Sequence, residues 1–191
     1  MYFKSGTQGM RVDNIESLTG CLKIPINTFH DNRGYFQETW NQNTLNKKVG
    51  ETIQFAQDNS SLSRRFVLRG LHYQYPKPQA KLLRVVNGSI IDVVVDLRRS
   101  SSTFGCWSSI EIEASSDFQL WVPTGFAHGF MAMADNTLIV YKTTDFWMMD
   151  CEYTLAWNDP TLAIEWPSGI EPIISEKDRF GLEFSMLPYF D

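Results

Sequence analysis

Alternation of apolar and polar side chains is the feature that most constrains the fold of this chain. Between Gly88 and Leu97 the sequence reads GSIIDVVVDL, and successive residues of an extended strand point to opposite faces. One face of such a strand is wholly apolar and carries Ile91, Val93, Val95 and Leu97. The opposite face mixes acidic with apolar residues: Ile90, Asp92, Val94 and Asp96. This period of two predicts a β-strand.

Similar β-rich runs recur along the chain, separated by Pro, Gly and Asn residues that favour turns. We expect further strands at residues 22–26, 34–40, 52–59, 108–113, 118–122, 126–133 and 137–144. The Asn87-Gly88 pair follows the run KLLRVV and predicts a tight β-hairpin, because both residue types tolerate positive φ. Helical patterns are confined to residues 43–49, closed by Gly50, and to residues 175–179.

Many short strands and few helices predict an all-β fold, an antiparallel sandwich or barrel with a few short peripheral helices. The interior of such a barrel is a natural ligand cavity. A length of 191 residues is enough for one domain with a real core, so we expect a single domain over residues 1–191.

Charge and composition narrow the possible partners. The formal net charge is −5, which argues against a protein that binds nucleic acid, although a few local arginines can still hold a small anionic ligand. Cys21, Cys106 and Cys151 are widely separated and form no CxxC motif, which is typical of reduced intracellular thiols. No apolar run is long enough for a membrane span, and the start of the chain, MYFKSGTQGM, lacks the apolar core of a secretion signal. We expect a cytoplasmic protein.

The segment VLRGLHYQYPKPQAK concentrates the residues best suited to chemistry. It places Arg69, His72 and Lys81 on neighbouring stretches of expected strand. His is the default general base because its unperturbed pKa lies near neutrality, and nearby cations would stabilise an anion formed by proton removal. The alternative is a surface hairpin with scattered charge.

Other polar residues have two interpretations each. Arg33 at a strand entrance can clamp a phosphate, and Glu38 can accept a hydrogen bond from a base or sugar, but a solvated turn would look the same. Gln57, Asn59 and Ser61 alternate along one strand face, which either lines a polar cavity or faces water. The pattern alone favours water.

Three further residues complete the candidates. His128, in VPTGFAHGF, is by itself more typical of a core histidine than of a ligand. Tyr141 is either a proton donor or an ordinary β-sheet tyrosine, and Asp178 either caps a short helix or orients a catalytic histidine. The spacing HxQ at 72–74 followed by PxGxxH at 123–128 is similar to the paired cupin motifs, but Gln74 stands where a metal cupin has a second His. No metal is therefore expected.

Taken together, the chain resembles the dTDP-4-dehydrorhamnose 3,5-epimerase family, a branch of the cupins, over roughly residues 22–180. The matching segments, in order, are DNRGYFQE, QDNSSLS, VLRGLH, the lysine of QAKLLRV, DVVVDLRRSSSTFGCW, LWVPTGFAHGF, IVYKTTDF, LAWNDPTLAIEWP and ISEKD. The resemblance implies a cupin jelly-roll barrel, a homodimer that swaps N-terminal strands, and action on a dTDP-linked 4-keto-6-deoxyhexose without metal or organic cofactor.

The resemblance also implies a role for each candidate residue. His72 would be the base, Asp178 its orienting partner, Lys81 the cation facing the C4 oxygen, and Tyr141 the acid on the opposite face. Substrate would be bound by Phe29, Arg33, Glu38, Gln57, Asn59, Arg69 and His128.

Two features of the sequence depart from a simple match. Arg69 and His72 have opposite strand parity, so they share a cavity only if Gly70 permits a bulge. The chain also reads Asp145-Phe146-Trp147 where family members usually carry another Tyr. Inversion at a single carbon, or a catalytically silent cupin that only binds a sugar nucleotide, therefore remain alternatives to inversion at both C3 and C5.

Overall fold

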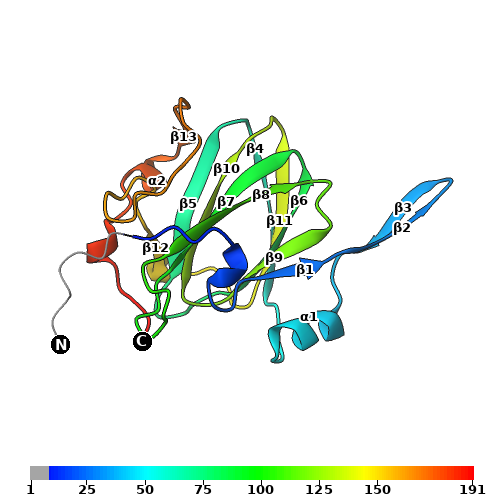
Figure 1. Ribbon diagram of the computed structural model, residues 1–191, viewed down its shortest axis with the longest axis horizontal. Helices are drawn as coiled ribbons and strands as arrows, with labels where there is room; N and C mark the ends of the chain where they lie inside the picture. The colour runs from blue at the N-terminus through cyan, green and yellow to red at the C-terminus, as the bar shows by residue number, and fades with distance from the viewer. Residues whose placement is uncertain (1–8) are drawn as a thin grey trace.

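The computed structural model describes residues 9–191, which build two facing sheets of mostly antiparallel strands (Figure 1). In hydrogen-bonded order, the first sheet contains β1 (Leu22–Pro25), β9 (Phe118–Val122), β6 (Lys81–Asn87), β11 (Thr137–Thr143) and β4 (Gln57–Ser63). The second contains β12 (Glu152–Thr154), β5 (Val67–Gln74), β10 (Phe126–Ala132), β7 (Ser89–Asp96) and β8 (Trp107–Glu113), with β13 (Ile173–Ile174) parallel to β5. The all-β prediction is confirmed.

The helical elements are short and peripheral, as predicted. They are α1 (Gln42–Val49), α2 (Glu176–Arg179) and the 3-10 turns η1 (Ile15–Ser17), η2 (Met149–Cys151) and η3 (Phe184–Met186). In α1 the Asn41 side chain accepts from the first free backbone N–H groups, and Gly50 closes the helix at φ 88°. Within residues 9–191, none of the helices has the length and apolar character needed to traverse a bilayer.

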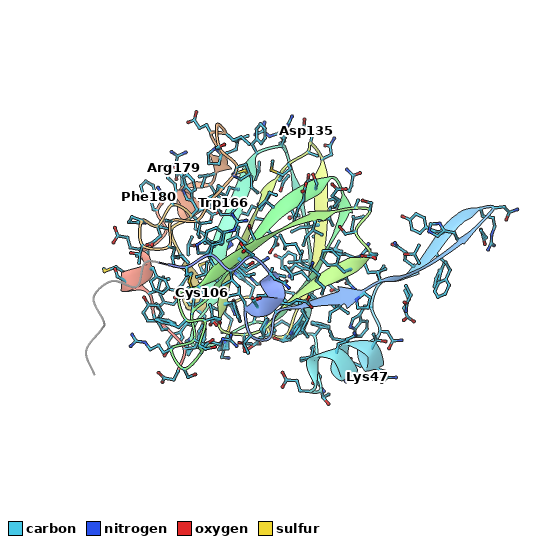
Figure 2. The ribbon with its side chains drawn as sticks, viewed as in Figure 1. Lys47, Cys106, Asp135, Trp166, Arg179 and Phe180 are labelled. Carbon is cyan, nitrogen blue, oxygen red and sulfur yellow. The ribbon has the colours of Figure 1, made fainter. Side chains whose placement is uncertain are left out.

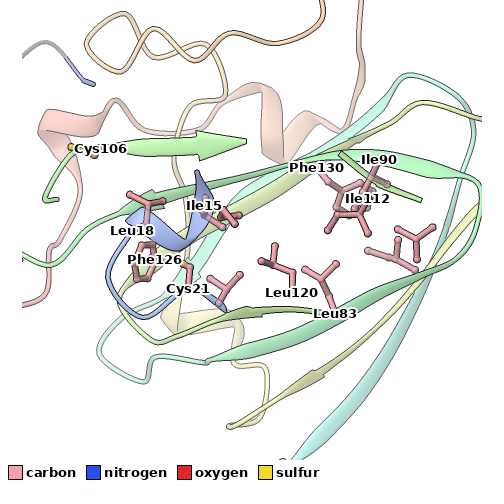
Figure 3. Close-up of a cluster of buried hydrophobic side chains, with 14 residues drawn as sticks. Ile15, Leu18, Cys21, Leu83, Ile90, Cys106, Ile112, Leu120, Phe126 and Phe130 are labelled. Atoms are coloured by element: carbon pink, nitrogen blue, oxygen red, sulfur yellow. The ribbon is translucent and has the colours of Figure 1, made fainter. Parts of the chain in front are cut away.

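Alternation along β7 buries both of its faces. Ile90 and Val94 enter an apolar cluster between the sheets, where Leu83 and Leu120 of the first sheet face Ile90 and Ile112 of the second (Figure 3). The other face of β7 packs into a cluster covered by the C-terminal part of the chain, including Trp166 (Figure 2). The division of β7 into two faces is therefore as predicted. The face that carries Val93 and Val95 is covered by the C-terminal part of the chain and does not face solvent.

The hairpin predicted at Asn87-Gly88 is wrong, because β6 and β7 belong to different sheets. Asn87 pairs with Leu138 of β11, whereas Ser89 pairs with Glu113 of β8. Gly88, at φ 80°, marks the point where the chain crosses between sheets, and a Cβ there would lie 2.5 Å from the Thr137 hydroxyl. Gly88 does adopt the positive φ that the Asn-Gly pair predicts, but which strands pair depends on contacts between residues distant in sequence.

The hairpin formed by β2 (Asn27–Asp31) and β3 (Gly34–Glu38) extends away from the two sheets (Figure 1). It forms a separate two-stranded ribbon whose Phe29, Tyr35 and Phe36 are 60%, 67% and 69% exposed. An isolated hairpin has little stability of its own, and large exposed aromatic side chains are typical of contact surfaces. The strand predicted at 52–59 begins only at Gln57, because Ile53 and Phe55 pack against α1 instead.

Candidate active site

A cavity of about 550 Å³ opens between the two sheets, beside the apolar core. Its walls come from β4, β6 and β11 of the first sheet and from β5, β10 and β12 of the second, with α2 at one edge. Of the predicted residues, it is lined by Gln57, Asn59, Arg69, His72, Lys81, His128, Tyr141 and Asp178. Residues far apart in sequence thus meet in one polar site.

His72 and Asp178 form a hydrogen-bonded pair in this cavity. The His72 Nε2 lies 2.5 Å from Asp178 Oδ1, and the backbone N–H of Gly70 donates to Asp178 Oδ2 at 3.2 Å. Burial raises the pKa of Asp178, but hydrogen bonds from His72, Gly70 and Ser175 outweigh it and hold the pKa below its usual value. Ser175 caps α2, so the Asp178 carboxylate is directed to His72 rather than used as the helix cap.

A β-bulge brings Arg69 and His72 to the same cavity. In the pairing of β5 with β10, His128 lies opposite His72 and Phe130 opposite Arg69, so one fewer residue separates the pairs on β10. The strands approach closely there, since a Cβ on Gly70 would lie 2.7 Å from the Cα of Gly129. The predicted bulge at Gly70 is confirmed.

Lys81 enters the cavity from β6. Its Nζ donates to the His72 carbonyl at 3.3 Å, so the ammonium lies close to β5, the strand that carries the His72 imidazole. Burial lowers the pKa of Lys81 from 10.5 to about 8, while Asp92 and Glu152 oppose this and Lys177 adds to it. The group is therefore mostly a cation at neutral pH, partly buried in the wall of the cavity.

Tyr141 faces the cavity from the opposite sheet. It pairs with Asn59 of β4 and Leu83 of β6, whereas His72 lies on β5 of the second sheet. Burial raises the pKa of the Tyr141 phenol, with Glu152 acting in the same direction and Arg69 against it. The phenol thus stays protonated and able to donate at neutral pH.

The polar row on β4 lines the cavity, so the solvent interpretation of Gln57, Asn59 and Ser61 is wrong. Although β4 is the last strand of its sheet, this face is turned toward β5 and the cavity. Gln57 donates to the Asn59 side chain at 2.7 Å, and Arg69 donates to the Ser63 hydroxyl at 3.1 Å. Side-chain alternation alone does not distinguish a cavity from bulk water.

Several residues that line the cavity were given no role from the sequence, among them Glu152, Lys177 and Trp147. Glu152 and Lys177 form an ion pair at 2.7 Å between β12 and α2, and the Trp147 backbone N–H donates to Gln57 at 3.0 Å. Lys177 precedes Asp178 directly, and this adjacency was the available signal. Nothing in the local sequence around Glu152 marks it as a site residue.

Gln74 has its amide turned toward the backbone. It donates to the Lys77 and Phe146 carbonyls and accepts from the Met148 N–H at 2.7 Å, which ties the loop after β11 to β5. Within residues 9–191, no cluster of at least three His, Cys, Asp or Glu side chains is arranged to hold a metal ion.

Phe29, Arg33 and Glu38 do not reach the cavity of their own chain. All three lie on the β2–β3 hairpin, and Arg33 forms an ion pair with Asp31 there. Their predicted contact with substrate stays a prediction, and it requires a neighbour that presents this hairpin to a cavity.

A family model described as dTDP-4-dehydrorhamnose 3,5-epimerase matches residues 16–185. The chain belongs to this family. The Pseudomonas aeruginosa dTDP-4-dehydrorhamnose 3,5-epimerase is 48% identical over 157 residues, covering 82% of this chain and 87% of the relative. The resemblance seen in the sequence is thus confirmed, and the chain is an enzyme of the epimerase class.

Solved structures of the epimerase family share the cupin jelly-roll fold predicted for this chain. The Legionella pneumophila enzyme, in complex with dTDP-4-keto-L-rhamnose, superposes with a TM-score of 0.85 at 37% identity, covering 88% of this chain and 90% of its own. The Bacillus anthracis enzyme, with TDP and PPi bound, has a TM-score of 0.83 at 41% identity, with coverages of 87% and 95%.

Proposed function

We propose that this epimerase inverts C3 and C5 of a dTDP-linked 4-keto-6-deoxyhexose, a step of deoxysugar biosynthesis. The observation that carries the proposal is the division of the cavity walls. His72, which is paired with Asp178 of α2, and the phenol of Tyr141 come from opposite sheets, with the Lys81 ammonium in the same cavity. Inversion at carbon needs a base on one face of a ring and an acid on the other.

His72 is the proposed base. The ionised Asp178 accepts from Nε2–H, so Nδ1 keeps its lone pair for the substrate proton, as with the carboxylate behind the histidine of a catalytic triad. A proton α to a ketone is weakly acidic, so its removal depends on stabilising the enolate. Lys81 is the group proposed for that, because a fixed cation at the C4 oxygen needs no reorganisation during the reaction.

Tyr141 is the proposed acid, which returns a proton to the face opposite His72. Its raised pKa favours the protonated phenol that this role needs. Gln57, Asn59, Arg69 and His128 are proposed to bind the sugar and diphosphate. The support for this is that all four line the same cavity as the proton-transfer groups.

A homodimer with exchanged N-terminal strands is also part of the proposal. The exposed aromatic residues of the β2–β3 hairpin and its distance from the sheets favour docking onto a second copy (Figure 1). Phe29, Arg33 and Glu38 would then reach the nucleotide in the neighbour's cavity. We further propose a single epimerase domain, with residues 1–8 outside the described part, and a cytoplasmic location in keeping with three free cysteines.

The test is proton NMR in D₂O with dTDP-4-keto-6-deoxyglucose as substrate. The expected result is deuterium at both C3 and C5 together with inverted configuration. Exchange at one carbon would establish the single-carbon alternative. Binding of the substrate without any exchange would establish the silent sugar-nucleotide-binding cupin and overturn the proposal.

A further inference from the structure

A second imidazole–carboxylate pair lies beneath the cavity, between β7 and β10. The His128 Nε2 is 2.8 Å from Asp92 Oδ2, and Asp92 is 0% exposed. The other carboxylate oxygen, Oδ1, is buried and has no hydrogen-bond partner among residues 9–191. His128 lines the cavity, whereas Asp92 does not, so the carboxylate acts on any ligand only through other groups.

Burial makes this carboxylate costly unless a positive charge faces it. Its strand neighbours on the same face, Ile90 and Val94, belong to the apolar core. Burial raises the pKa of Asp92 above its usual value, and His128 and Lys81 limit that rise without cancelling it. In turn, Asp92 is the largest of the influences that raise the pKa of Lys81 against its own burial.

Three charged side chains have the main influence on the pKa of Lys81. Asp92 of β7 and Glu152 of β12 favour its ammonium form, and Lys177 of α2 disfavours it. Glu152 is already paired with Lys177 at 2.7 Å, which leaves Asp92 as the larger anionic influence on Lys81. The nearby His72 contributes its carbonyl oxygen to Lys81 and its ring to Asp178.

We propose that Asp92 is a positioning residue of this epimerase: its carboxylate is the buried counter-charge of Lys81 and fixes the His128 ring with Nε2–H toward Asp92. The inference rests on the proposed role of Lys81 at the C4 oxygen. With Nε2 donating, Nδ1 of His128 is left as an acceptor, suited to a sugar hydroxyl.

The consequence is a defined pH dependence. The ammonium of Lys81 is the form that stabilises an enolate, so activity falls as pH rises through the pKa of Lys81, about 8. Removing the negative charge of Asp92 lowers that pKa further. The alkaline limb of the pH–rate profile should therefore move to lower pH by about one unit or more, the size of shift expected for a lost opposite charge.

Asp92→Asn is the informative variant, because an amide oxygen still accepts from His128 while the charge is lost. Asp96→Asn is the matched control: Asp96 lies on the same strand and face, is 0% exposed, and is bonded to Arg98, Ser101 and Thr103 instead. We expect the control to lose thermal stability but keep the wild-type alkaline limb. A folded Asp92→Asn protein with an unshifted limb would overturn the proposal.

NMR of the wild-type protein tests the inference without relying on either variant or on turnover. Titration of the Lys81 side chain, the ¹³C shift of the Asp92 carboxyl and the ¹⁵N shifts of His128 report charge and tautomer directly. We expect an ionised Asp92 and an Nε2–H tautomer of His128 at neutral pH. A protonated Asp92 would refute the counter-charge role even in an active enzyme. Conversely, the expected NMR state in a protein without epimerase activity would uphold the pair and reject the proposed function.

Discussion

At the scale of single residues, the two proposed proton-transfer groups, His72 and Tyr141, differ in how they are held. His72 has a carboxylate partner at 2.5 Å, whereas no hydrogen bond to a neighbour restrains the Tyr141 hydroxyl among the bonds of the described chain. A base must present one tautomer to the substrate, so a fixed hydrogen-bond partner is an advantage. An acid must reach a carbon atom whose position depends on how the sugar ring lies in the cavity, so some freedom of the side chain is an advantage. The two groups should therefore respond differently to substitution.

His72→Asn should abolish deuterium exchange at both carbons while the protein stays folded. Loss of a general base costs about 10²–10⁴ in rate. The His72 side chain is 27% exposed, so its replacement leaves no large cavity in the core. Exchange measured by NMR, with circular dichroism as the folding control, tests this. Exchange near the wild-type rate would remove His72 from the mechanism.

Tyr141→Phe should reduce inversion more than exchange, because His72 can still remove a proton and return a deuteron on its own side. The measurement compares deuterium incorporation with the yield of epimerised product. Tyr153→Phe is a matched control, since Tyr153 stacks on Tyr73 in the outer cluster and does not line the cavity. Equal loss of exchange and inversion in Tyr141→Phe would mean that Tyr141 mainly positions substrate.

Trp147 occupies the cavity edge near the position where family members usually carry a tyrosine. Burial raises the pKa of Glu152, and Lys177 followed by the Trp147 side chain lowers it, so that this pKa lies below its usual value. One hydrogen bond to a ring hydroxyl is worth about 0.5–1.5 kcal/mol, enough to bias two ring poses by up to roughly tenfold. We expect C3 and C5 to label at unequal rates, and Trp147→Tyr to speed the slower one. Equal labelling in the wild-type protein would contradict this.

At the scale of elements, the close approach of β5 and β10 is what aligns Arg69 and His72. Gly129 has no room for a side chain, because a Cβ would lie 2.6 Å from the Arg69 carbonyl and 3.0 Å from Leu71. Gly129→Ala should therefore destabilise the protein by about 1–3 kcal/mol, the usual cost of overpacking. It should also lower activity, since the bulge would shift. Urea denaturation and exchange rates measure both, and an unchanged midpoint would argue against the tight contact.

Elements also show how far sequence reasoning reaches. The faces of β7, the capped α1 and the bulge at Gly70 followed from patterns within a few residues, and all are confirmed. The partner of β6 and the environment of β4 did not, because the first depends on which strands lie beside β6 in its sheet and the second on which strand faces β4 across the cavity. The same limit hid Asp92 and Glu152, whose importance lies in neighbours from distant strands rather than in a local motif.

At the scale of the whole molecule, the proposed exchange of the β2–β3 hairpin makes a sharp prediction about mixed dimers. Arg33→Ala damages the hairpin but leaves its own cavity intact, whereas His72→Asn does the reverse. Each homodimer should be nearly inactive. In a heterodimer, the intact hairpin of the His72→Asn chain would serve the intact cavity of the Arg33→Ala chain, restoring one working site.

Co-expression of the two variants with different affinity tags allows the heterodimer to be isolated and assayed. Activity about half that of the wild-type dimer is the expected result, because one of two sites is complete. If the heterodimer and the Arg33→Ala homodimer are both inactive, the hairpin serves the site of its own chain. A monomeric protein in solution would reject the exchange altogether.

The spacing of the two sheets also sets a distance inside the cavity. Because the proposed base and acid lie on separate sheets, the distance between them depends on the thickness of the apolar layer beside the cavity, where Leu83, Leu120 and Ile112 meet (Figure 3). Tyr141 packs directly against that layer. Leu120 and Ile112 do not line the cavity, yet they help to set the distance over which a hydrogen must change sides, so stereochemical fidelity is in part a property of the core.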